Sequence, residues 1–99
     1  MTDDLGLDAQ PFDAAEAVQK LQRGLRDLGL IERAGRFERR GIAIARAGID
    51  GMTVRAARVK RPSRSSPEWA ERVLRSSADA RDFVADLKKQ LAQWSDRDD

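Results

Sequence analysis

The chain has 99 residues, of which 40% are hydrophobic and 36% charged, with a formal net charge of +2, and this composition predicts one small globular domain. It contains no cysteine, histidine or tyrosine, which excludes disulfides, zinc sites built from Cys and His, and acid–base catalysis by imidazole. No apolar run approaches the roughly 18 residues of a membrane span, and the first residues lack the basic and apolar regions of a signal peptide, so we expect a cytoplasmic protein without metal, cofactor or membrane contact.

The small net charge conceals an uneven distribution along the chain. Residues 1–18 are acidic, and residues 65–99 carry a slight acidic excess. Between them, residues 32–64 contain ten basic and three acidic side chains. The middle of the sequence is therefore a basic block between acidic flanks.

The first element expected along the chain is a helix over residues 13–28. Asp13 is a suitable N-cap with Glu16 three residues later, which is the spacing of a capping box. Apolar residues then recur at steps of three and four, as on one face of a helix: Ala14, Val18, Leu21, Leu25 and Leu28. Gly29 suits the position after the last turn. Residues 1–12 show no periodicity and are expected to form a flexible acidic arm.

A β-hairpin is expected next. Residues 42–46 and 52–56 alternate between large and small side chains, as strands do, and the five residues between them have turn composition. A five-residue loop would pair Ile44 with Val54 and place the apolar side chains on one face. A two-residue turn at Asp50-Gly51 would divide them between both faces, so the longer loop is preferred.

The last expected element is a long helix over about residues 67–94. Ser66 and Pro67 suit its first turn. Ser76 and Asp79 also have the spacing of a capping box, which allows a break near residue 76. An apolar stripe with alternating steps of four and three residues follows the helix: Val73, Ser77, Ala80, Val84, Leu87, Leu91 and Trp94. Residues 95–99 are expected to fray.

These elements predict an α+β fold in the order helix, two-stranded antiparallel hairpin and long C-terminal helix, as a single domain over residues 13–94. The alternative is an all-α fold with residues 36–47 helical. It arises because Phe37, Ile44 and Ala45 also fit helical spacing and alanine is a weak strand former.

The basic block is the first candidate functional feature. Guanidinium groups present planar pairs of donors that suit phosphate oxygens. In the hairpin interpretation one group of basic residues lines a strand end and the following loop, while Arg39 and Arg40 lie near the opposite end of the paired strand. The predicted nucleic-acid or anion-binding residues are Arg39, Arg40, Arg55, Arg58, Lys60, Arg61 and Arg64. The competing interpretation is a solvated basic face that pairs with the acidic flanks.

The apolar stripe of the last helix is the second candidate feature. At 1.5 Å per residue this helix would be roughly 42 Å long and the first helix roughly 24 Å, so the first helix cannot cover it fully. Either the hairpin or another subunit must therefore cover the C-terminal turns. The predicted interface with a partner protein or a second copy consists of Val84, Leu87, Leu91 and Trp94.

Together these features predict a non-catalytic protein–protein interaction module with a basic hairpin edge for an anionic partner. One alternative is a sequence-nonspecific nucleic-acid-binding dimer that contacts phosphates through Arg and Lys. A second alternative is a small enzyme that acts on an anionic metabolite through Arg and Lys electrostatics alone. The carboxylates of Asp79, Asp82 and Asp86 have helical spacing and are interpreted as a salt-bridged solvent face.

Overall fold

The computed structural model describes residues 12–97, which form two helices and one five-stranded antiparallel sheet. In chain order the elements are α2 (Ala14–Asp27), β1 (Ile31–Arg33), β2 (Arg36–Arg39), β3 (Ile42–Asp50), β4 (Thr53–Val59), β5 (Trp69–Leu74) and α3 (Ser77–Arg97). The sheet order is β1-β2-β3-β4-β5, so strands that are consecutive in the chain are neighbours in the sheet. The α+β class is confirmed, whereas the two-stranded hairpin and the all-α alternative with residues 36–47 helical are both wrong.

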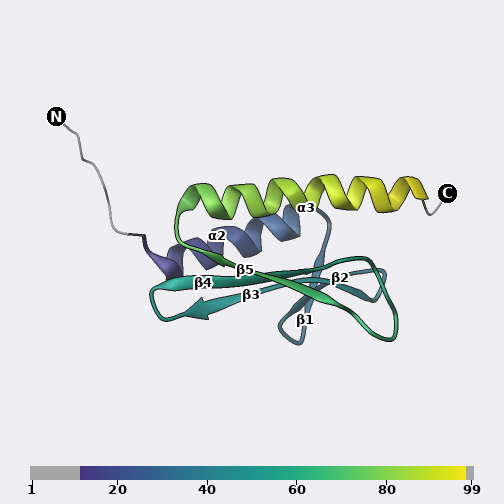
Figure 1. Cartoon of the computed structure of the whole chain (residues 1–99), viewed down its shortest axis with the longest axis horizontal. Coiled ribbons are helices and arrows are strands. Elements are labelled where there is room, and N and C mark those ends of the chain that lie inside the picture. Colours follow the sequence, from purple (N-terminus) through teal and green to yellow (C-terminus); the bar gives the residue numbers. More distant parts are fainter. Residues whose placement is uncertain (1–11, 98–99) are drawn as a thin grey trace.

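Both helices lie on one face of the sheet (Figure 1). α2 contacts β3 and β4, while α3 contacts β5 and α2. Buried apolar side chains fill the space between the two layers, among them Leu21 and Leu25 of α2, Leu74 of β5 and Leu87 of α3. Within the described part of the chain, neither helix is long and apolar enough to cross a membrane.

The predicted first helix is confirmed as α2, together with both of its end signals. Asp13 is the N-cap, and its Oδ1 accepts the N–H of Glu16 at 3.1 Å. Beyond the last turn the chain folds back, because the N–H of Leu30 donates to the carbonyl of Leu25 at 3.3 Å and the Leu30 side chain is buried. This is the pairing of a Schellman motif. The predicted acidic arm, apart from Phe12, lies outside the described residues.

The strands predicted over residues 42–46 and 52–56 are parts of the longer strands β3 and β4. A two-residue turn, Gly51-Met52, joins them in place of the predicted five-residue loop, and Val54 pairs with Ile49 in place of Ile44. Gly51 has a φ of 64°, which the first position of a type II′ hairpin turn requires.

The sheet differs from the prediction because it buries apolar side chains on both faces. Val54 and Ala57 lie three residues apart on β4 and therefore point to opposite faces, yet they are only 0% and 1% exposed. Ile44 is the extra residue of a bulge, where residues 43–45 of β3 lie against Phe37 and Glu38 of β2. A bulge bends its strand and increases the local twist. The sheet therefore curls, and part of the face turned away from the helices belongs to the core.

Two further hairpin turns connect β1 and β2, which were not predicted from the sequence, to each other and to β3. Ala34-Gly35 joins β1 to β2, and Arg40-Gly41 joins β2 to β3. All four residues have positive φ values, from 53° to 79°, as in type I′ turns. A residue followed by glycine was thus the local signal for both turns.

The C-terminal helix begins at Ser77 and not at residue 67. Residues 69–74 form β5 instead, so the predicted cap at Ser66 and Pro67 is wrong. The predicted break near residue 76 is the true helix start, because Ser76 Oγ accepts the N–H of Asp79 at 3.1 Å. The helix continues through Arg97 across most of the predicted frayed tail, and residues 98 and 99 lie outside the described residues.

Candidate functional site

The antiparallel sheet brings two basic segments to the same end of the molecule. The β2–β3 turn and the β4–β5 loop, residues 60–68, share this end because β2, β3 and β4 alternate in direction (Figure 1). The register that pairs Ala45 with Arg58 continues to place Arg61 level with Ile42, the first residue after the turn. β2 and β4 flank β3, so their backbones are about 10 Å apart. We call the side chains of Arg40, Lys60, Arg61 and Arg64 the basic end.

The fold leaves the charges of the basic end uncompensated. All four side chains are exposed, and none makes an ion pair within residues 12–97. The acidic residue nearest to Arg40 in the sequence, Glu38, lies 4.0 Å from Arg33. The loop itself is held by its backbone, since the N–H of Lys60 donates to the carbonyl of Glu68 at 2.9 Å. Four positive charges therefore face solvent on a two-residue turn and a nine-residue loop, which also carries the exposed carboxylate of Glu68.

The other three predicted anion-binding residues are placed differently. Arg39 and Arg40 lie at the same end as Lys60 and Arg61, and not at the opposite end as predicted. Nη1 of Arg39 donates to the carbonyl of Leu91 at 3.4 Å. That carbonyl belongs to the C-terminal part of α3, where the helix dipole favours a cation. Arg58 Nη1 donates to the carbonyl of Val59 at 3.3 Å. Arg55, near the other end of β4, is bound by carboxylates.

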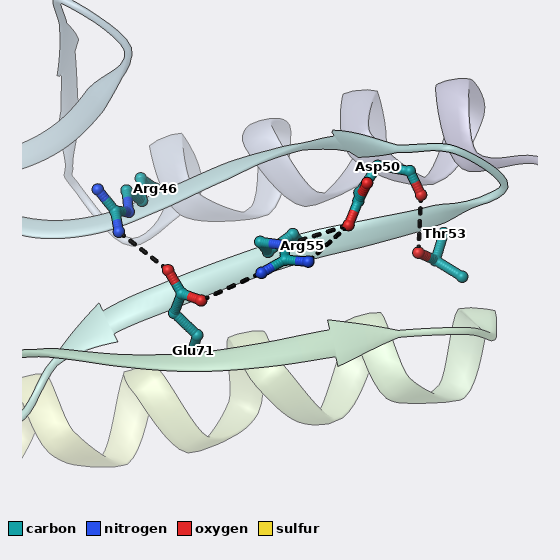
Figure 2. A network of polar contacts seen from close by, with 5 residues as sticks. All are labelled: Arg46, Asp50, Thr53, Arg55 and Glu71. Carbon is teal, nitrogen blue, oxygen red and sulfur yellow. Dashed lines mark hydrogen bonds and ion pairs between the residues drawn. The ribbon is translucent and has the colours of Figure 1, made fainter.

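Arg55 belongs to a polar network that crosses three strands (Figure 2). Its Nη2 lies 2.7 Å from Oδ2 of Asp50, and its Nη1 lies 3.3 Å from Oε1 of Glu71. The other oxygen of Glu71, Oε2, lies 3.1 Å from Nη2 of Arg46. The guanidinium of Arg46 also stacks over the ring of Trp69, 4.5 Å from its centroid. β3, β4 and β5 are thus linked on the face turned away from the helices.

The network neutralises its own charges. The hydrogen bond and the negative charge of Asp50, and to a smaller extent those of Glu71, raise the pKa of Arg55 above its usual value. The side chains border a hollow of about 430 Å³, which Gly35 of the β1–β2 turn also lines. An anionic substrate in this hollow would have to displace a carboxylate from an arginine. This charge balance does not favour the alternative of a small enzyme that works by Arg and Lys electrostatics.

We expect Glu71→Gln to lower the free energy of unfolding by about 0.5–1 kcal/mol, because solvent screens ion pairs between half-exposed side chains. The loss should shrink in about 1 M NaCl, where the screening length falls to a few ångströms. Urea denaturation at low and high salt measures both effects. Glu32→Gln, which removes the single exposed pair with Arg26, is the matched control. A salt-independent loss above about 2 kcal/mol would contradict this view of the network.

Comparison with protein-family models, with curated proteins and with solved structures gives no match. The function therefore has to be argued from where the fold places its charges and apolar side chains. Within residues 12–97, no group of three or more acidic side chains gathers in a way that could hold a metal ion.

The predicted partner interface on the last helix lies largely inside the molecule. Leu87 is 0% exposed, and Leu91 and Trp94 are each 7% exposed. Val84 is half-buried, and it packs so closely on α2 that a Cβ added to Gly24 would lie 3.3 Å from Val84 Cγ2. The chain's own sheet and α2 provide the cover that the sequence analysis assigned to a partner. The proposal of a docking stripe thereby loses the observation on which it depended.

Proposed function

We propose that the protein is a non-catalytic binding module that takes an anionic partner at its basic end. The observation that carries this proposal is the absence of ion-pair partners for Arg40, Lys60, Arg61 and Arg64 within the described residues, although the same fold neutralises Arg46 and Arg55. A charge left uncompensated at a tight turn raises the local potential and attracts a counter-charge. The basic end therefore gathers four basic side chains that have no ion-pair partner within the described residues.

The phosphate backbone of a nucleic acid is the anion that best suits this arrangement. Three of the four side chains are arginines, whose planar donors engage two phosphate oxygens at once. Neither connection contains an aromatic residue, and Trp69 is stacked with Arg46, so base stacking at the basic end is not supported. We therefore propose contacts with phosphates alone, without reading of the base sequence.

The salt dependence of binding to a short fluorescent DNA duplex tests this proposal. With four phosphate contacts, the slope of log K against log salt should be about −3.6, so affinity should fall about 150-fold between about 50 and 200 mM salt. Fluorescence anisotropy measures the affinity at each salt concentration. Duplexes of unrelated sequence should bind equally well.

The triple substitution Lys60→Glu, Arg61→Glu and Arg64→Glu should abolish this binding, because it reverses the potential of the basic end. The matched control makes the same change of charge on the exposed face of α3, at Arg81, Lys88 and Lys89. Circular dichroism establishes that both variants fold. If both variants lose binding equally, or the unaltered protein does not bind at low salt, the basic end is not a nucleic-acid site.

A further inference from the structure

The two edges of the sheet are protected to different degrees. β1 has only three residues, and two of them, Glu32 and Arg33, are charged. β5 has six residues in an unbroken register with β4, and within residues 12–97 no strand pairs with its outer side. Its charged side chains, Glu71 and Arg72, are held over the two faces of the sheet by ion pairs, not along the edge. A long and regular edge strand without such protection is a template for pairing with another chain.

The backbone groups that this edge offers follow from the ladder with β4. The N–H of Lys60 donates to the carbonyl of Glu68, which makes these two residues a hydrogen-bonded antiparallel pair. Such pairs alternate along the ladder, so Ala70, Arg72 and Leu74 direct their N–H and C=O groups to β4. The groups that point outward belong to Trp69, Glu71 and Val73.

A row of carboxylates from α3 follows the same edge on the helix side of the sheet. Asp86 lies 3.4 Å from Arg72 in the middle of β5, and Asp79 accepts the N–H of Arg75, just beyond the strand, at 3.0 Å. The strand spacing from residue 72 to 75 and the helix spacing from residue 79 to 86 are both about 10 Å. The carboxylates of α3 therefore lie beside successive positions along β5. Asp82 lies between the other two at helical spacing and is exposed. Arg72 offsets only one of the three negative charges.

We propose that the outer edge of β5 binds an extended, basic segment of a partner protein as a sixth strand. The outward backbone groups supply the hydrogen bonds of strand addition, and alternate side chains of the segment face the carboxylate row. A second copy does not suit this edge, because a two-fold axis through paired β5 strands places both α3 helices on the same side, with their carboxylate rows facing each other. This surface is independent of the basic end.

A Thr-Lys repeat peptide is the probe, because every second side chain is basic and none is hydrophobic. Amide hydrogen exchange followed by NMR reads out its binding. In the free protein the outward amides of Glu71 and Val73 should exchange rapidly, and saturating peptide should slow them at least about tenfold, while the amides of Ala70 and Arg72 should change little. A Thr-Glu repeat peptide should give no protection.

Two variants test the backbone and the charges separately. Val73→Pro removes one outward N–H but no hydrogen bond to β4, so the fold should remain and peptide binding should be lost. Asp82→Asn combined with Asp86→Asn should weaken binding about tenfold, at roughly 0.7 kcal/mol for each exposed pair. Glu16→Gln combined with Asp27→Asn, which removes two carboxylates from α2, is the matched control and should bind normally.

Three results would overturn this proposal. The first is the absence of protection at the outward amides with the Thr-Lys peptide. The second is binding that Val73→Pro leaves intact. The third is a homodimer, seen by light scattering, that Val73→Pro converts to a monomer, because a second copy would then occupy the edge.

Discussion

Leu87→Ala is expected to lower the free energy of unfolding by about 3 kcal/mol, because it removes a fully buried side chain and leaves a cavity between α3 and the sheet. Leu87 is 0% exposed and belongs to the cluster that contains Leu21, Leu25 and Leu74. The packing on both sides comes from the same chain, so the loss should not depend on protein concentration. Urea denaturation at two concentrations, about twentyfold apart, measures both quantities.

This measurement distinguishes packing of the apolar stripe of α3 within its own chain from packing against a second copy. If Leu87 packed against a second copy, the midpoint of unfolding would rise with concentration in the unaltered protein and fall most in the variant at high concentration. Lys88→Ala, at an exposed position next to it, is the control and should change stability by less than about 0.5 kcal/mol. A concentration-dependent loss at Leu87 would restore the predicted interface and contradict the burial seen here.

The helix ends were predictable because their signals are local. The N-cap hydrogen bond from Glu16 to Asp13 and the hydrogen bond of Leu30 to Leu25 join residues at most five apart, and the N-cap at Asp13 and the helix end before Gly29 are where the sequence placed them. Ser76 and Asp79 gave the same kind of signal for α3. The apolar spacing, however, extends back through Val73 and so favoured an earlier helix start. Val73 lies in β5, a strand that is held by its pairing with β4. A short apolar run carries too little periodicity to distinguish a strand from a helical turn.

The sheet was harder to predict because its neighbours decide which side chains are buried. With one apolar face assumed, a two-residue turn at Asp50-Gly51 was rejected, whereas the turn that forms is Gly51-Met52, one residue later. The sheet buries Val54 and Ala57 on opposite faces, so the assumption of one apolar face was wrong. The turn at Arg40-Gly41 lacks the Asn or Asp that usually marks a type I′ turn.

The sequence showed which residues of the candidate site are basic, but not which of them have no ion-pair partner in the fold. Arg55 was grouped with Lys60 because they are close in the sequence. In the fold, Arg55 is paired with Glu71, sixteen residues away on β5, and with Asp50 at the start of the β3–β4 turn. Cross-strand pairing therefore decides which cations form ion pairs with carboxylates, and this pairing cannot be derived without the register. The basic end could be found only after that pairing was known.

Ile44→Ala is expected to cost about 3 kcal/mol of unfolding free energy, a loss as large as that for a residue of the main core. Ile44 is the extra residue of the bulge between β2 and β3, is only 2% exposed, and belongs to the same buried cluster as Leu21 and Leu87. At a solvated position the same substitution would cost less than about 0.5 kcal/mol, so the measurement decides whether the bulge places Ile44 in the core. Thermal or urea unfolding of the two proteins gives the difference.

Ile31→Ala is the matched control, because it makes the same chemical change at a strand residue that is 70% exposed. It should change the stability by less than about 0.5 kcal/mol. A small loss at Ile44 would contradict the burial of the bulge residue in the core.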